Sequence, residues 1–301
     1  MSRSLSSNRG ALFVTLAIIL GTASLAAQRP RPLSPLPDEG LGVAPFFDGW
    51  YQNPDGTITF SFGYSNLNRE VVEIPLGPNN FIVPKEHDGR QPTSFAPATA
   101  ASAGDDGGAG RRERERGVFT ITVPAGFKGD VVWTLQHRGQ SFKVPARAKT
   151  GAYQLQWPMA MGSIPPLLRF TPDGPTGRGP VGIQADPLKV ASGTPLSLTI
   201  WAVDDSVREK DPVSIKPRGR GDARGAINAT WYKHSGPGAV AFDPAKQPIA
   251  ELQGSVTTLA TFAQPGEYVI RVRADNFGRV DTSPGNQCCW TNGYVKVTVT
   301  P

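Results

Sequence analysis

Two adjacent cysteines are the residues of this sequence best suited to unusual chemistry. Cys288 and Cys289 are its only cysteines, and Trp290 follows them directly. Neighbouring Cα atoms lie about 3.8 Å apart, which is shorter than the roughly 4.4–6.8 Å of most disulfides. A bond between the two would therefore close a strained ring, and such strain persists where a rigid loop is required. Three states stay open: a vicinal disulfide, reduced or intermolecularly paired thiols, and a metal site, for which adjacent thiolates are poorly placed.

The N-terminus reads as a secretory signal peptide over residues 1–27. Arg3 and Arg9 precede an apolar run at 11–20, and small residues follow in the order that signal peptidase requires, with Ser24 and Ala26 before the cleavage point. The alternative is an uncleaved anchor, but the run is shorter than the roughly 20 residues of a membrane span. We therefore expect a secreted or periplasmic protein without a membrane span in the mature chain. Such compartments are oxidising, which favours disulfides.

Charge and motif content argue against several functional classes. The net charge of +6 falls to +4 when the signal peptide leaves with its two arginines, and the basic residues form no dense block with interleaved aromatics. Nucleic acid is therefore not an expected partner. The sequence lacks a nucleophile elbow, a zinc-protease helix and a phosphate-binding glycine loop, and its three histidines occupy turns or loops. We expect no catalytic residue, no metal ligand, no cofactor and no enzymatic activity.

The elements that must position the cysteine pair are short strands. Ile58, Phe60, Phe62 and Tyr64 alternate with polar or small residues, which predicts a strand with one buried face. The segment 226–276 holds three further alternating runs, separated by Gly- and Pro-containing turns. Trp231 lies in the first of these runs, and Tyr268 begins the last, directly after a Pro-Gly corner. The chain is therefore expected to be all-β.

Composition divides the chain into segments. A Pro-rich leader at 28–45 precedes a first β-sandwich domain at 46–157, which contains a disordered insertion at 85–117 where six basic residues balance six acidic ones. A Pro-rich linker at 158–187 then leads to a second β-sandwich domain at 188–301. The fold class predicted is two immunoglobulin-like β-sandwich domains in tandem after a signal peptide.

The second domain resembles a known group of modules. The runs TWYKHSGPGAVAF and TTLATFAQPGEYVIRVRADN resemble PKD-like and related immunoglobulin-like repeats of secreted bacterial proteins, over about residues 188–300. The first half, together with the tail CCWTNGYVKVTV, is similar to an uncharacterised family of secreted bacterial proteins. The resemblance implies a β-sandwich fold and no particular activity, because such modules serve as spacers, binders and adhesion units.

Two loops flanking the segment 226–276 form the predicted binding surface. Residues 206–225 join the second and third strands and carry six basic and three acidic residues, and residues 275–292 join the last two strands. In the immunoglobulin arrangement these loops leave the sandwich at the same end. The alternative is that Trp290 covers the end of the core and a disulfide only staples a long loop. The residues predicted to bind are Trp290, Arg208, Arg218, Arg220 and Arg224.

Four aspartates and one asparagine are predicted to lie at the end of the second sandwich where the two loops emerge. Asp204, Asp205, Asp275, Asn276 and Asp281 offer oxygen ligands of the kind calcium requires, yet no compact motif fixes their spacing, so no metal ligand is assigned. The function expected is a non-enzymatic secreted binding or structural module that recognises a protein or glycan of the cell envelope. The alternative is a redox or metal-handling protein centred on the adjacent cysteines. Neither the binding-module hypothesis nor the redox hypothesis predicts an oligomeric state.

Overall fold

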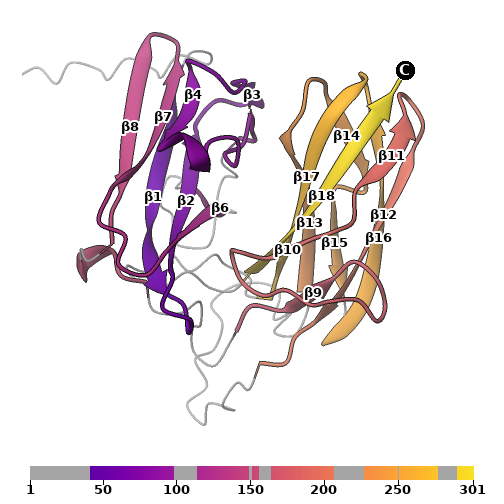
Figure 1. Ribbon diagram of the computed structural model, residues 1–301. Coiled ribbons are helices and arrows are strands. Elements are labelled where there is room, and N and C mark those ends of the chain that lie inside the picture. The colour runs from indigo at the N-terminus through magenta and orange to yellow at the C-terminus, as the bar shows by residue number, and fades with distance from the viewer. Residues whose placement is uncertain are drawn as a thin grey trace, which may run out of the picture. The chain divides into compact units, whose positions relative to one another are not determined.

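The computed structural model (Figure 1) describes residues 41–97, 114–148, 151–155, 164–206, 227–249, 251–276 and 290–301. Within these residues the secondary structure consists of β-strands and two single 3₁₀ turns, Lys85–His87 and Gly151–Tyr153, which confirms the all-β prediction. Residues 38–301 belong to one compact unit that contains two separate hydrophobic cores. The predicted signal peptide, residues 1–27, lies outside the described residues.

The first sandwich is built from two three-stranded antiparallel sheets. Its sheets have the orders β1-β2-β6 and β4-β7-β8, and β3 and β5 pair as a small separate ribbon. With β1, β2, β4, β6, β7 and β8 as strands A, B, C, E, F and G, this is the immunoglobulin arrangement without strand D. The strands are β1 (Val43–Gln52), β2 (Ile58–Asn66), β3 (Val72–Glu73), β4 (Asn80–Val83), β5 (Ser94–Phe95), β6 (Glu115–Val123), β7 (Val131–His137) and β8 (Gln140–Ala146).

Aromatic side chains fill the first core. Phe62 stacks on Phe119 with 5.0 Å between ring centroids, and the Trp133 ring meets Phe119 edge-on at 5.1 Å. Each such pair contributes about 0.5–1.5 kcal/mol beyond its buried area. The Trp133 indole also donates a 3.0 Å hydrogen bond to Asn80 Oδ1, so its buried N–H has a partner. The buried face predicted for β2 is confirmed, because Ile58, Phe60, Phe62 and Tyr64 are all buried.

The second sandwich is built from two larger sheets. One sheet has the order β14-β16-β12-β9, and the other has the order β10-β18-β17-β13-β15, with β11 parallel to β18. β9, β12 and β16 correspond to strands A, B and E, and β10, β13, β17 and β18 to A′, C, F and G; β14 and β15 extend the two sheets beside β16 and β13. The strands are β9 (Leu167–Arg169), β10 (Ile183–Gln184), β11 (Leu188–Ala191), β12 (Leu196–Val203), β13 (Ile227–Ser235), β14 (Val240–Asp243), β15 (Lys246–Ile249), β16 (Gln253–Phe262), β17 (Gly266–Asp275) and β18 (Trp290–Thr300).

Tyr268 forms the corner that its position at the start of β17 predicts. Its hydroxyl donates a 2.8 Å hydrogen bond to Gln264 O and accepts a 3.0 Å bond from Gly238 N–H. Gly236 lies under the ring with φ +140°, and a Cβ there would approach Tyr268 Cδ1 to 2.1 Å. The turn between β13 and β14 therefore needs glycine for both its backbone angle and its space.

Several predicted boundaries fall inside structured segments. Of the predicted insertion at 85–117, residues 85–97 contain a 3₁₀ turn and β5, and β6 begins at Glu115; residues 98–113 lie outside the described part. The predicted linker at 158–187 contains β9 and β10, which pair with β12 and β18. These strands are only two or three residues long, so they carry too few residues for a period to be recognised. No helix in the described ranges has the length and apolarity of a membrane span.

Candidate functional site

The outer face of the sheet containing β13, β17 and β18 is covered rather than exposed to solvent. Alternation along β17 places Ile270 and Val272 in the core, and it therefore places Arg271 on the opposite face. Arg271 is nevertheless only 1% exposed. Residues of the first sandwich contact this face through the ion pairs and hydrogen bonds that follow. The two sandwiches thus share a buried polar interface.

A charge cluster lies within this interface. Glu115 on β6 lies 3.6 Å from the Arg271 guanidinium and 3.3 Å from that of Arg273, and Arg273 lies 3.7 Å from Asp275. Arg271 also stacks over the ring of Tyr232 at 4.4 Å. Because both Glu115 and Arg271 are buried, each needs the other as a counter-charge. The cluster therefore depends on β6 of the first sandwich lying against β17 of the second.

Two hydrogen bonds bind β18 to the backbone of β6. The Tyr294 hydroxyl donates to Val118 O at 2.9 Å, and Asn292 Nδ2 donates to Gly117 O at 2.7 Å. Burial raises the pKa of Tyr294 to about 12, so its phenol stays protonated and remains a donor. Both acceptors are backbone carbonyls, so neither hydrogen bond uses a side chain of β6.

Gly117 lies close to the indole of Trp290 in the interface. Its φ is +55°, and a Cβ there would lie 2.5 Å from Cζ2 of Trp290. Its N–H donates a 2.9 Å hydrogen bond to Asp48 Oδ2. Asp48 is buried, and desolvation raises its pKa to about 6, although the Gly117 N–H and the guanidinium groups of Arg114 and Arg116 act in the opposite direction.

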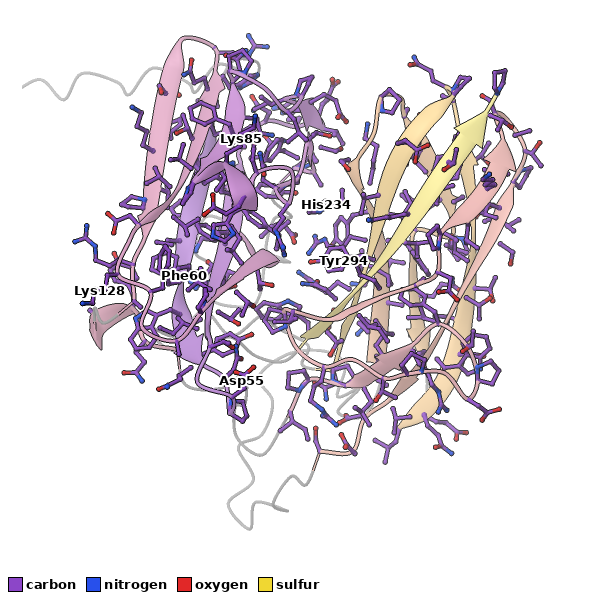
Figure 2. The ribbon with its side chains drawn as sticks, in the orientation of Figure 1. Asp55, Phe60, Lys85, Lys128, His234 and Tyr294 are labelled. Carbon is purple, nitrogen blue, oxygen red and sulfur yellow. The ribbon has the colours of Figure 1, made fainter. Side chains whose placement is uncertain are left out.

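His234 joins β13 to the loop that precedes β5. Its Nε2 lies 3.0 Å from Arg90 O, and its own carbonyl accepts a 2.9 Å hydrogen bond from Thr93 N–H. The imidazole meets the ring of Tyr294 edge-on, with 5.7 Å between centroids (Figure 2). Burial lowers the pKa of His234 to about 4, so the ring is neutral at neutral pH. Since a carbonyl only accepts, Nε2 carries the proton and Nδ1 is an acceptor.

A cavity of about 260 Å³ lies beside this interface and takes its walls from both sandwiches. We call it the inter-sandwich cavity. Its walls combine aromatic and aliphatic side chains with one carboxylate, one ammonium, one guanidinium and one imidazole. Residues from the first sandwich are Tyr64, Val71, Glu73, Pro92, Ser94, Ala96 and Val118; residues from the second are Trp231, Tyr232, Lys233, His234, Ala239, Val240, Phe242 and Arg271.

Two buried polar atoms of the cavity residues have no hydrogen-bond partner among the described residues: Trp231 Nε1 and His234 Nδ1. The first is a donor and the second, by the argument above, an acceptor. A buried polar group without a partner costs about 1–3 kcal/mol, so native proteins keep few of them. Glu73, by contrast, is paired: it lies 2.9 Å from Lys233 Nζ and accepts a 2.9 Å bond from Ser94 Oγ.

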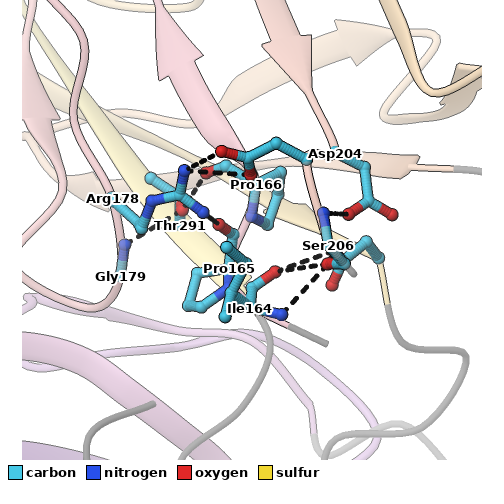
Figure 3. A network of polar contacts seen from close by, with 10 residues as sticks. Ile164, Pro165, Pro166, Arg178, Gly179, Asp204, Ser206 and Thr291 are labelled. Atoms are coloured by element: carbon cyan, nitrogen blue, oxygen red, sulfur yellow. Dashed lines mark hydrogen bonds and ion pairs between the residues drawn. The ribbon is translucent and has the colours of Figure 1, made fainter. Parts of the chain in front are cut away.

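The loops predicted from the sequence to bind a partner leave the second sandwich from neighbouring stems. Residues 207–226 follow Ser206, residues 277–289 follow Asn276, and Asn276 Nδ2 donates to Ser206 Oγ at 3.2 Å. The Asn276 and Ser206 side chains also bond to Ile164 O. Figure 3 shows the contact between Ser206 and Ile164 and the hydrogen bond that Thr291 donates to Pro166 O. The two stems are therefore held together by one set of polar contacts.

Most of the predicted binding residues lie outside the described residues. These are Arg208, Arg218, Arg220, Arg224, Cys288 and Cys289. Trp290 is described and is 1% exposed, because its indole packs on Gly117 at the interface. A direct contact between Trp290 and a partner would require the indole to leave this position. The predicted role of the two loops in binding stays a prediction.

The described residues among those considered for calcium, Asp204, Asp205, Asp275 and Asn276, each have a protein partner. Asp205 receives two hydrogen bonds from Arg178 Nη2, at 2.9 and 2.7 Å, which lower the pKa of its carboxyl. Asp204 Oδ1 accepts from Ser206 N–H at 3.1 Å, and Asn276 uses its amide as described above. Asp281 lies outside the described residues. Within the described ranges, no three His, Cys, Asp or Glu side chains are grouped to hold a metal ion.

Sequence reasoning missed the interface and its cavity. Arg271, Tyr232 and Tyr294 occupy the face of β13, β17 and β18 that alternation assigns to solvent. The one available signal was the aromatic content of that face, because Tyr and Arg are enriched at interfaces between folded units. His234 was placed in a turn, whereas it lies on β13 at a register shift between Lys233 and Ser235.

Comparisons with known proteins identify no family. Neither a protein-family model nor a curated protein matches this chain. Among solved structures, the D00-D0 domain of intimin matches with 11% identity over 86% of this chain and 100% of its own, at a TM-score of 0.26. Domains 4 and 5 of the S-layer protein SbsC match with 11% identity over 58% of this chain and 66% of theirs, at 0.24.

A third structure, the MSP family member WR4 of C. elegans, matches with 12% identity over 38% of this chain and 91% of its own, at 0.22. TM-scores this low establish no common fold and no common function. The immunoglobulin-like assignment therefore rests on the strand order and pairing of the two sandwiches. The resemblance to PKD-like repeats stays a prediction.

Proposed function

We propose that this chain is a non-enzymatic module, exported to the cell envelope, that binds a protein or glycan partner there. The observation that supports it is the pair of loop stems joined by the Asn276–Ser206 hydrogen bond at one end of the second sandwich. Loops anchored side by side on a rigid sandwich are the usual place for binding residues in this architecture.

The composition of the two loops favours an acidic partner. Residues 207–226 hold the four arginines predicted to bind, Arg208, Arg218, Arg220 and Arg224. Arginine pairs with carboxylates and sulfates through two parallel hydrogen bonds. In the proposed surface Trp290 acts as the buried anchor at the start of β18, which fixes where the second loop rejoins the sandwich.

Sedimentation with isolated cell envelopes tests this proposal. Labelled mature chain, starting at residue 28, should bind the envelope fraction saturably, and Arg218→Ala with Arg220→Ala should weaken binding at least about tenfold, the effect of losing a charge-assisted hydrogen bond. Lys189→Ala with Lys296→Ala is the matched control, because both lysines are exposed on the second sandwich. If the arginine variant binds as tightly as the wild-type chain, the prediction that these loops form the binding surface is wrong.

Pretreatment of the envelopes separates the two kinds of partner. Periodate, which cleaves vicinal diols, abolishes binding to a glycan, and protease abolishes binding to a protein. Thiol titration of Cys288 and Cys289 with and without reductant tests the redox alternative. A cysteine pair that is oxidised and reduced at mild potentials supports a redox role, whereas a pair that resists reduction supports a structural disulfide. Hydrolysis of a model ester, peptide or glycoside, lost on a point mutation, would overturn the non-enzymatic assignment.

A further inference from the structure

We propose that the inter-sandwich cavity binds a single uncharged sugar ring of a glycan. This inference rests on the proposed function and narrows its partner from a protein or glycan to a glycan. It concerns the cavity whose described walls include residues of β13, Ala239, Val240 and Phe242, and the region around β3 and β5.

The size of the cavity suits one ring. Its volume is about 260 Å³, whereas pockets that enclose drug-sized ligands measure about 300–1,000 Å³. Its lining residues come from both sandwiches, so a ring inside would contact side chains of each. A longer chain would extend from the cavity past Val71, which lies on its rim and is 51% exposed.

The unpartnered polar atoms call for a ligand that both accepts and donates. Trp231 Nε1 offers a proton, and His234 Nδ1 offers a lone pair. A hydroxyl group accepts from the first and donates to the second. A carboxylate or phosphate only accepts, so it would leave His234 Nδ1 without a partner. Sugar hydroxyls therefore match this pair of atoms better than an anion does.

The charged side chains of the cavity are already neutralised. Lys233 is paired with Glu73, and it also donates a 2.8 Å hydrogen bond to Gly238 O. Arg271 is paired with Glu115 and stacks on Tyr232. No unpaired cation among the lining residues remains to attract an anion, which agrees with an uncharged ligand. The Glu73 side chain is 46% exposed, so its carboxylate can still accept from a hydroxyl.

The apolar walls suit the C–H faces of a sugar. Trp231 and Phe242 lie nearly parallel with 6.5 Å between ring centroids, and Val240 continues the same side of the cavity. Val118 and Pro92 belong to the wall from the first sandwich. A pyranose presents hydroxyls around its rim and C–H groups on its faces, which is the same division into polar and apolar contacts.

Ligand-observed NMR on the whole mature chain tests the inference. The probes are the methyl glycosides of glucose, galactose, mannose and N-acetylglucosamine, each at millimolar concentration. At least one should receive saturation from the protein. Ala239→Trp places a large side chain at an exposed position of the cavity wall and should abolish the signal, whereas Ala241→Trp, exposed two residues further on and outside the wall, should not.

A second pair of variants examines the indole N–H. Trp231→Phe should weaken the bound glycoside about tenfold, the effect of losing one hydrogen bond to a buried donor. Trp201→Phe is the matched control, because Trp201 belongs to β12 and does not line the cavity. Should Trp231→Phe fail to fold, the Ala239→Trp pair decides alone, since both of its positions are exposed.

The outcomes separate this inference from the proposed function. If no glycoside binds, or if binding survives Ala239→Trp, the cavity is not a sugar site, while envelope binding that depends on Arg218 and Arg220 still supports the proposed function. If a peptide library binds and Ala239→Trp blocks it, the cavity takes a protein partner and the sugar assignment is wrong. Glycoside binding lost only in Ala239→Trp and weakened in Trp231→Phe supports the inference.

Discussion

Asp48 and His234 are expected to oppose each other in the pH dependence of stability. Both are buried near the interface, where Asp48 accepts from Gly117 N–H and His234 bonds to Arg90 O. Desolvation raises the pKa of Asp48 to about 6 and lowers the pKa of His234 to about 4. The perturbations are Asp48→Asn and His234→Gln, which keep the acceptor for Gly117 and the donor for Arg90 while removing each titration.

The signs follow from which state binds more protons. Between about pH 3.8 and 6 the folded state holds a proton on Asp48 that the unfolded state has lost, so Asp48 makes stability fall as pH rises. Between about pH 4 and 6.5 the unfolded state holds a proton on His234 that the folded state lacks, so His234 makes stability fall as pH drops. Each shift exceeds two pH units, and at about 1.4 kcal/mol per unit each amounts to about 3 kcal/mol.

Urea unfolding followed by tryptophan fluorescence at about pH 4, 5, 6 and 7 measures these effects. Relative to wild type at each pH, Asp48→Asn should gain about 3 kcal/mol in free energy of unfolding from pH 4 to 6, and His234→Gln should lose about as much from pH 4 to 6.5. Taking differences from wild type removes the contributions of all other groups. Differences that stay flat within about 0.5 kcal/mol across the range would refute the assigned burial of these residues.

Three further substitutions test the contacts themselves, each by its urea midpoint. Glu115→Gln should destabilise by about 3 kcal/mol, because it leaves the Arg271 guanidinium buried without a counter-charge; an effect below about 1 kcal/mol would contradict this. Tyr268→Phe should cost about 1–3 kcal/mol, because the buried Gly238 N–H loses its acceptor. Gly117→Ala should cost at least about 1–3 kcal/mol from its positive φ alone, and more from the clash with the indole of β18; a neutral effect would contradict the close approach.

Patterns within single strands could be predicted from the sequence because each depends on local alternation. A period of two along β17 places Tyr268, Ile270, Val272 and Ala274 on one face, and all four are buried. Tyr268 begins this alternating run directly after a Pro-Gly turn, which is where a corner tyrosine is expected. The pairing partners of β9 and β10 could not be read in this way, because two or three residues in a Pro-rich segment define no period.

The interface escaped prediction for a different physical reason. A period of two distinguishes the two faces of a strand, but it identifies the solvent face only if nothing else covers it. On β2, Thr59 and Ser61 were assigned to the open face and are buried, and Arg271 on β17 is buried in the same way. Thr59 and Arg271 have partners far away in the sequence: Thr59 bonds to Thr122, and Arg271 pairs with Glu115.

Because such partners are specific, a polar face buried between two sandwiches depends on their arrangement more strictly than an apolar face would. A shift that breaks the Glu115 contact leaves a buried charge unpaired, whereas an apolar interface can slide with less penalty. The inter-sandwich cavity depends on the same contacts, since its walls come from both sides. Glu115→Gln should therefore weaken glycoside binding more than Tyr268→Phe does, although both lower stability, because only the first alters the interface. Equal loss of binding in the two variants would mean that binding follows overall stability and not the arrangement of the sandwiches.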